Sequence, residues 1–222
     1  PEPRRPFMDA PIETFTSDQL QSGVKRILDL CGALIGLILF GPLFLLITVL
    51  LQIETPGKIF YRQERLGYAG VRFGMLKFRT MRECAEEELG NVILKDPKYL
   101  FEYERYQKLA QDPRLTRVGR ILRKTSLDEL PQLWNVLVGE MSLVGPRPFL
   151  PGQLALYGPT YLEYQRVLPG LTGLWQVSGR NRLTFQERVC LDEKYIQEWS
   201  IRLDLEILAR TPWAVIFQVG AC

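Results

Sequence analysis

The sequence predicts a mixed α/β, helix-rich fold in which a compact folded domain follows an N-terminal membrane helix. Residues 30–53 form a run of 24 residues without a charge, and about 20 apolar residues are enough to span the hydrocarbon core of a bilayer. Hydrophobic residues make up only 46% of the 222-residue chain, so the apolar excess is local. We therefore expect a flexible tail over residues 1–20, a membrane helix over residues 21–55 and a folded domain over residues 56–222.

The first part of the chain is the proline-rich stretch PEPRRPFMDAP, which lacks an initiator methionine. Proline-rich segments tend to stay extended rather than pack into a core. We expect this opening to be a flexible tail, and the chain to be a fragment or a processed form of a longer protein.

Gly41 and Pro42 lie in the middle of the apolar run. Proline lacks the N–H that would bond the carbonyl of Ile38, and its ring clashes with that turn, at a cost of about 3 kcal/mol. Basic residues flank the run on both sides, and cytoplasmic flanks are enriched in Lys and Arg. A re-entrant helix that is broken at Gly41-Pro42 would keep both flanks on one face of the membrane. A kinked single span and a buried soluble hairpin are the alternatives.

The charge is unevenly distributed, although its net value is only +3. Arg and Lys dominate residues 58–82 and 114–124, whereas residues 83–104 are rich in acids. Two basic blocks favour an anionic partner such as a phosphate, a nucleotide or a lipid headgroup. The combination of a membrane run and an acidic block, without a groove-binding motif, argues against nucleic acid.

The residue inventory also limits the chemistry. The chain has no histidine, which excludes Ser-His and Cys-His catalytic pairs and histidine-based metal sites. The four cysteines are scattered without a CxxC spacing, so zinc and redox sites are not indicated and the pattern fits a reducing compartment.

The segments after the apolar run are predicted in order. Residues 58–81 alternate aromatic and β-branched residues with polar ones around three glycines, which is typical of a short β-hairpin. Residues 82–112 are charged and helix-prone, and predict two exposed helices or a mobile lid. Residues 114–124 carry an arginine at every third position. They predict a short amphipathic helix, either in a membrane interface or on an ordinary surface.

The C-terminal half continues with less regular segments. Residues 145–151 are too rich in proline for a helix and predict a rigid loop that presents Arg147. Residues 170–181 are rich in glycine and predict a tight hairpin or a loop. Residues 183–219 have a helical pattern, which we expect Pro212 to interrupt near its end.

Asp128 and Glu129 are adjacent carboxylates at the predicted start of a helix. Ser126 and Glu129 match a capping box. Alternatively, Asp128 is the N-cap and Pro131 falls in the first turn. The helix dipole favours ionised carboxylates at this place, which is also a natural anion site. A purely structural capping role is the alternative to a chemical one.

Without histidine, a carboxylate nucleophile is the main remaining option for covalent phosphoryl chemistry. Such chemistry needs cationic groups to offset the phosphate oxygens, and usually a divalent metal. Lys77, Arg79 and Arg147 are the candidates for the cationic groups.

Five stretches of the chain carry a specific resemblance. They are KRILDL at 25–30, GP at 41–42, KFRTM at 77–81, RKTSLDELPQLWNVLVGEMSLVGPRP at 123–148 and PGLTGLWQVSGRN at 169–181. In this order and spacing, the chain resembles the bacterial sugar transferase family, the monotopic polyprenyl-phosphate phosphoglycosyl transferases, over roughly residues 24–222. The resemblance implies a re-entrant membrane helix broken at a proline. Many members have Ser-Pro at the break, where this chain has Gly41-Pro42.

The resemblance also implies a reaction and its partners. A nucleotide diphosphate sugar, expected to be a UDP-sugar, would donate sugar 1-phosphate to undecaprenyl or another polyprenyl phosphate and release UMP. This is the first membrane step in the assembly of exopolysaccharide, O-antigen or capsule. The enzyme would act at the bacterial inner membrane, among membrane lipids, with its catalytic domain on the cytoplasmic face; a homodimer is left open. The alternative is a non-catalytic membrane-anchored scaffold that binds anionic lipids.

The resemblance assigns roles to individual residues. Asp128 matches the nucleophile, which would form a covalent aspartyl intermediate and bind Mg²⁺ together with the donor diphosphate. Glu129 matches its dyad partner, expected to deprotonate or orient the lipid phosphate. Arg147 matches the phosphate-binding arginine, and Lys77 and Arg123 match further cationic positions. The residues expected to shape the substrate pocket are Gly170, Thr172, Gly173, Gln176 and Arg180.

Overall fold

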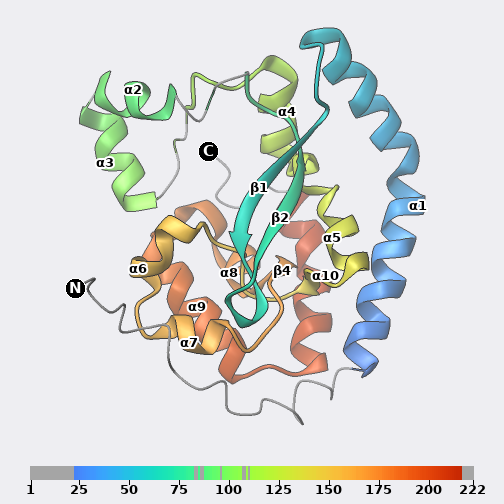
Figure 1. Ribbon diagram of the computed structural model, residues 1–222. Coiled ribbons are helices and arrows are strands. Elements are labelled where there is room, and N and C mark those ends of the chain that lie inside the picture. The colour runs from blue at the N-terminus through green and yellow to red at the C-terminus, as the bar shows by residue number, and fades with distance from the viewer. Residues whose placement is uncertain are drawn as a thin grey trace, which may run out of the picture.

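The computed structural model describes residues 23–82, 85, 88–95, 97–106, 109 and 111–216. The tail predicted over residues 1–20 lies outside these ranges. Within them the protein is helix-rich and mixed α/β, as the sequence predicted, with two small sheets of two strands each. Figure 1 shows α1 along one side of the molecule, with the other elements gathered on its inner side.

The elements within the described ranges are bounded as follows. The helices are α1 (Gly23–Glu54), α2 (Glu88–Lys95), α3 (Pro97–Tyr106), α4 (Arg117–Thr125), α5 (Gln132–Val138), α6 (Leu154–Tyr157), α7 (Thr160–Tyr164), α8 (Leu174–Ser178), α9 (Phe185–Gln197) and α10 (Ile201–Ile216). The strands are β1 (Phe60–Leu66), β2 (Arg72–Phe78), β3 (Ser142–Val144) and β4 (Gly170–Thr172). Short 3-10 turns are η2 (Tyr68–Gly70), η3 (Leu127–Glu129), η4 (Pro151–Gln153) and η5 (Arg180–Arg182).

Helix α1 presents a narrow inner stripe to the domain and a broad apolar outer face. Ala33, Ile47 and Leu51 are buried, and they pack against β2, α4 and α5. Only 11% of the most apolar stretch of α1 is buried, and α1 is the one described helix that is long and apolar enough to cross a membrane. The exposed apolar face supports the predicted membrane helix.

The helix continues through Gly41 and Pro42, so the predicted interruption of the helix at these residues is not found. Proline already has helical φ, and losing one hydrogen bond bends a helix without having to end it. Figure 1 shows α1 bowed, with its concave side toward the domain. The path of α1 relative to a membrane stays a prediction.

Both ends of α1 are bonded to the same domain. Near its start, Lys25 forms an ion pair with Asp204 at 2.6 Å, and Arg26 donates to two carbonyls at the end of α5 at 2.7 and 2.9 Å. At its end, Glu54 accepts hydrogen bonds from two backbone amides at the start of α4, at 2.6 and 2.9 Å. The domain therefore fixes the position of the whole helix.

The predicted hairpin over residues 58–81 is confirmed. Strands β1 and β2 pair antiparallel, with a register that runs from Phe60 opposite Phe78 to Leu66 opposite Arg72. Phe73 and Met75 are buried on one face of β2, and alternate residues of a strand share a face. Lys77 is the next residue on this face, so the strand itself directs an ammonium group toward the interior.

Strands β3 and β4 form a parallel pair, with Ser142 opposite Gly170 and Val144 opposite Thr172. A Cβ on Gly170 would lie 2.1 Å from the backbone nitrogen of Gly145, so the two chain segments can approach only through glycine. The hairpin or loop predicted over residues 170–181 is therefore wrong: the segment forms β4, α8 and η5, because β4 pairs with a distant strand.

The remaining helices largely follow the prediction. Helices α2 and α3 are the two helices expected within residues 82–112, α4 covers the expected amphipathic helix, and α9 and α10 occupy the C-terminal helical segment. The interruption expected at Pro212 is not found, since α10 continues through it. Helix α4 brings the chain back beside the end of α1, and the turn that follows α4 carries the two carboxylates.

Candidate active site

Asp128 and Glu129 lie in the 3-10 turn η3, which connects α4 to α5. Ser126, two residues before Asp128, has a left-handed φ of +58°, so the chain turns sharply at the end of α4. Neither predicted cap forms: no side chain caps η3, and α5 begins only after Pro131. The capping box does not form because both of its side chains have other partners: Ser126 Oγ accepts a hydrogen bond from Arg180 at 2.6 Å, and Glu129 is bonded by Lys77 and Arg147.

Two cations hold the carboxylate of Glu129. Lys77 Nζ donates to Oε1 at 2.9 Å, and Arg147 donates to both carboxylate oxygens, with a distance of 3.1 Å from Nη1 to Oε2. Burial alone would raise the pKa of Glu129, but Arg147 and Lys77 outweigh burial and lower this pKa well below its usual range. Glu129 is therefore ionised at neutral pH and is a weak base.

The surroundings of Asp128 differ from those of Glu129. Its side chain is buried, and no other described residue donates a hydrogen bond to it. Burial is the largest influence on the pKa of Asp128 and raises it to about 6; Lys77 opposes this rise and Glu129 adds to it. At neutral pH the carboxylate is mostly ionised, and its oxygens remain available for bonding. An available, ionised carboxylate is a competent nucleophile or metal ligand.

Five cationic side chains surround the two carboxylates. The predicted phosphate-binding residues Lys77, Arg123 and Arg147 all act on the pKa of Asp128. Arg65 and Arg180 join them, since each interacts with Glu129 and with Arg147. Five cations against two carboxylates leave three positive charges, which suits a ligand with several phosphate oxygens.

The proline-rich loop presents Arg147 to the site, as predicted. The loop follows β3 and precedes η4, and Arg65 donates to the carbonyl of Pro148 at 3.1 Å. The ring of Trp175 lies 6.0 Å from the guanidinium of Arg147, a distance typical of a cation–π contact. Glu129 on one side and Trp175 on another thus fix the orientation of Arg147.

The predicted substrate-pocket residues divide into those that lie by the dyad and those that bond groups within the fold. Arg180 lies by the dyad, where it bonds Ser126 and interacts with Glu129. The hydroxyl of Thr172 bonds a threonine hydroxyl of α10 at 2.9 Å, and the side-chain amide of Gln176 donates to a carbonyl of β4 at 2.9 Å.

The two predicted pocket glycines have a role in the backbone. A Cβ on Gly173 would lie 2.3 Å from the carbonyl oxygen of Gly145, and a Cβ on Gly170 would lie 2.1 Å from the backbone nitrogen of the same residue. Both glycines therefore allow the close approach of the loop that carries Arg147, and their part in a substrate pocket stays a prediction.

Sequence reasoning missed three residues that shape the site: Arg65, Trp175 and Asp192. Asp192 is buried and accepts a hydrogen bond from the hydroxyl of Tyr157 at 3.2 Å. Burial raises the pKa of Asp192 well above its usual range. Helical spacing in the sequence could have identified Asp192 as a buried residue. Asp192 lies on α9 between Val189 and Tyr195, three residues from each, on the buried face of the helix.

A metal site made by protein side chains alone is not found, since no three acidic or cysteine side chains gather within the ranges that the structure describes. Mg²⁺ usually binds through one or two carboxylates together with substrate phosphates and water. Asp128 offers such a carboxylate, whereas the oxygens of Glu129 are taken by Lys77 and Arg147. The residues present thus fit a magnesium ion that Asp128 would hold, with substrate and water supplying its other ligands.

Known proteins match this chain over most of its length. Exopolysaccharide production protein ExoY of Rhizobium meliloti is 45% identical over 211 residues, which cover 95% of this chain and 93% of that protein. The UDP-glucose:undecaprenyl-phosphate glucose-1-phosphate transferase of Caulobacter vibrioides is 43% identical over 84% of this chain and 67% of that protein. The undecaprenyl-phosphate galactose phosphotransferase of Salmonella typhimurium is 41% identical over 89% of this chain, but over only 41% of its own length.

The family model described as bacterial sugar transferase matches residues 20–218. This match covers the apolar helix, the hairpin, the carboxylate turn and the arginine loop. It confirms the resemblance that the five sequence stretches indicated. The chain therefore belongs to the bacterial sugar transferase family, and it is a phosphoglycosyl transferase.

Proposed function

We propose that the protein transfers a sugar 1-phosphate from a nucleotide diphosphate sugar, a UDP-sugar, to undecaprenyl or another polyprenyl phosphate. The product is the lipid-linked sugar diphosphate that begins exopolysaccharide or related glycoconjugate assembly. The observation that carries the proposal is the division between two adjacent carboxylates. Glu129 is held by two cations, whereas Asp128 is buried, mostly ionised at neutral pH and not hydrogen-bonded by any described residue.

In the first step, an oxygen of Asp128 forms a bond to the phosphorus that carries the sugar. The bond from this phosphorus to the bridging oxygen of the diphosphate breaks, and UMP leaves with that oxygen and its electron pair. Arg147, Lys77 and Arg123 each interact with Asp128, which supports a role for them in offsetting the charge on the phosphate oxygens, the main contribution a protein makes to phosphoryl transfer.

In the second step, an oxygen of the lipid phosphate forms a bond to the same phosphorus, and the bond to Asp128 breaks. This restores the carboxylate. A phosphate monoester has a second pKa of about 6, so the lipid phosphate enters largely as a dianion and needs little help from a base. The lowered pKa of Glu129 accordingly supports a role in orienting Lys77 and Arg147, and through them the lipid phosphate, rather than in proton removal.

Magnesium is proposed as the cofactor, held by Asp128 and the donor diphosphate. When bound, it would neutralise phosphate charge and favour departure of the nucleotide. Lys77 and Arg147 remain on Glu129, so their positions do not depend on the ion.

The membrane placement is part of the proposal. The two ends of α1 bond the same domain, and the outer face of α1 is apolar and exposed along its length. A straight span would draw polar parts of the domain into hydrocarbon, which is costly. We therefore propose a re-entrant placement in the bacterial inner membrane, with the domain at the cytoplasmic surface, where lipid phosphates lie; a homodimer is compatible with it.

The placement can be tested by thiol labelling in a variant whose four native cysteines are replaced. Single cysteines would be placed at Gly23, which has open space around it, and at Lys58, which is exposed. An impermeant reagent should label both positions in one of the two preparations, right-side-out or inverted vesicles, and neither position in the other. Labelling from opposite sides would replace the re-entrant placement with a single span.

A non-catalytic scaffold that binds anionic lipids is not favoured. Basic surface residues would be sufficient for such a role. It gives no reason for the position of Asp128, which is buried without a hydrogen bond from any described residue beside a Glu129 that two cations hold, because burying such a carboxylate costs folding energy.

A panel of UDP-sugars tests the proposed function. Purified protein would be incubated with undecaprenyl phosphate, Mg²⁺ and one donor at a time, and UMP release would be measured. We expect lipid-dependent release of UMP from at least one donor, and none from the Asp128→Asn variant. Equal release from wild type and Asp128→Asn would contradict the proposed role of Asp128.

A further inference from the structure

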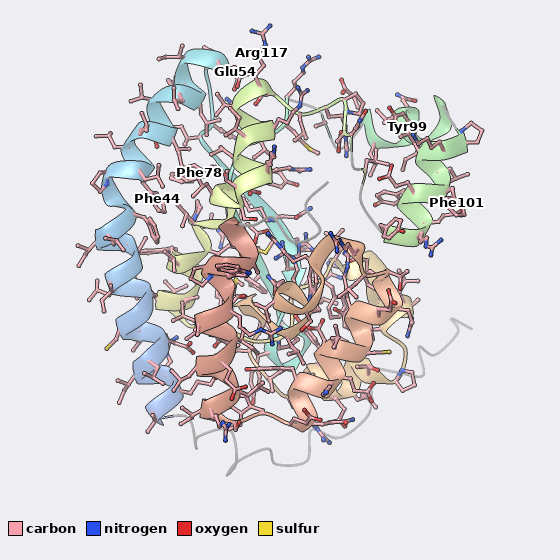
Figure 2. The ribbon with its side chains drawn as sticks, turned by 180° about the vertical axis from the view of Figure 1, so that it is seen from behind. Phe44, Glu54, Phe78, Tyr99, Phe101 and Arg117 are labelled. Carbon is pink, nitrogen blue, oxygen red and sulfur yellow. The ribbon has the colours of Figure 1, made fainter. Side chains whose placement is uncertain are left out.

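A polar pocket of about 360 Å³ lies where α1 ends and α4 begins. Figure 2 shows Glu54 and Arg117 together at this end of the molecule. The pocket is lined chiefly by polar side chains, namely Glu54, Thr55, Arg82, Thr116, Arg117 and Arg120. Helix α4 separates it from the dyad: its nine residues span about 13 Å, and the dyad follows its far end.

The pocket has an excess of positive charge. Among the described residues that line it, Glu54 is the one acid, and both of its carboxylate oxygens already accept hydrogen bonds from the backbone amides of α4. Within the described part of the chain, the guanidinium groups of Arg82, Arg117 and Arg120 form no hydrogen bond or close ion pair. Among the described lining residues, three guanidiniums against one carboxylate leave two positive charges. Guanidinium groups of this kind suit the oxygens of a phosphate.

An apolar surface continues from the pocket. Ile53, next to Glu54 on α1, is 75% exposed, and Ile121, next to Arg120 on α4, is 62% exposed. The exposed apolar face of α1 extends from there along the helix. A free phosphate or a nucleotide would gain nothing from this surface, whereas a lipid would place its acyl chains on it.

We propose that this pocket binds the phosphate group of an anionic membrane phospholipid, separately from the acceptor lipid that reacts at Asp128. The three arginines bond the phosphate, and the acyl chains follow the outer face of α1. Bound in this way, the lipid holds the end of α1 and the start of α4 at headgroup level. The site goes beyond the transfer reaction, because no reacting group takes part in it.

Native mass spectrometry of the full, detergent-solubilised chain tests this proposal. The protein would be titrated with phosphatidylglycerol or phosphatidylcholine of identical acyl chains. Wild type should bind the first phosphatidylglycerol more tightly than phosphatidylcholine. Arg117→Gln/Arg120→Gln should weaken phosphatidylglycerol binding by roughly 30-fold, as expected for two arginines near an anionic lipid, and leave phosphatidylcholine binding unchanged.

A charge-matched variant, Arg72→Gln/Arg202→Gln, removes two exposed arginines from other elements and should behave as wild type; their side chains are 64% and 88% exposed. Arg82→Gln, tested alone, should also weaken phosphatidylglycerol binding, which keeps the test valid if the double variant does not fold. An unchanged lipid preference in the folded pocket variants would overturn the proposal. Soluble glycerol phosphate binding as tightly as phosphatidylglycerol would overturn the assignment to a lipid. The readout involves no transfer and is independent of the proposed reaction.

Discussion

The turn at residues 126–131 and the glycine-rich segment at residues 169–182 have equally distinctive sequences but serve the site differently. In the turn, the carboxylate of Asp128 accepts no hydrogen bond from the described residues, while Glu129 is held by cations. In the glycine-rich segment, Thr172 and Gln176 bond groups within the fold, whereas Arg180 bonds Ser126 and interacts with Glu129. The difference shows that a distinctive motif can supply either chemistry or the support that positions it.

The largest effect should come from Asp128→Asn. The amide has nearly the same size but is a poor nucleophile, so we expect turnover to fall on the order of 10⁴-fold or more, as for loss of a nucleophile in other covalent enzymes. Initial rates of UMP release would measure it, with the melting temperature as the control for folding. If the variant keeps a tenth of the wild-type rate, Asp128 is not the nucleophile.

Arg147→Ala should have the second-largest effect. We expect its turnover to fall about 100-fold, which is typical of removing one group that stabilises transition-state charge. The substitution also removes one of the two cations from Glu129. Arg202→Ala, whose side chain is 88% exposed on α10, is the matched control and should keep full activity. A loss of less than about tenfold, or 1.4 kcal/mol, would make Arg147 a supporting residue, like most of the glycine-rich segment.

The pH dependence should separate Asp128 from Glu129. The pKa of Asp128 is raised to about 6, so its protonated fraction grows as the pH falls through this value and the nucleophile is lost. The kcat/KM for the donor, which reports the free enzyme, should fall about tenfold for each pH unit below about 6. A profile that is flat through the first unit below this value would indicate that Asp128 is not the group that attacks.

Thr172→Val should have the smallest effect and should act on stability alone. It removes the hydroxyl that bonds Thr211 at 2.9 Å, at a cost of about 1 kcal/mol, or about 2–4 °C in melting temperature. The rate per folded molecule should stay the same. A rate loss of tenfold or more without a change in melting temperature would instead place Thr172 in the substrate pocket.

The parts of the fold with strong local patterns could be predicted from the sequence. The apolar run of α1, the β1–β2 hairpin and the loop around Arg147 follow from periodicity, alternation and proline content within short segments. The prediction for Pro42 was less successful, because a single proline can be accommodated in a long helix that packs against a domain.

Other features depend on contacts between distant parts of the chain. The pairing of β3 with β4 joins strands of only three residues each, which carry too little pattern to be recognised. The contrast between Asp128 and Glu129 depends on Lys77 from β2 and on Arg147 from a later loop. Local sequence suggested a capping box, whereas the tertiary contacts decided which carboxylate is held and which is available.

The central claim is that Asp128 carries the sugar phosphate during the reaction, and trapping the intermediate tests it most directly. Wild type would be mixed with UDP-sugar and Mg²⁺ without lipid, quenched rapidly and examined by intact-protein mass spectrometry. We predict a mass increase equal to one sugar phosphate, located at Asp128, released by hydroxylamine and absent from Asp128→Asn. If no adduct forms, and initial-rate lines for the two substrates intersect rather than run parallel, the sugar phosphate passes directly between substrates and the account is contradicted.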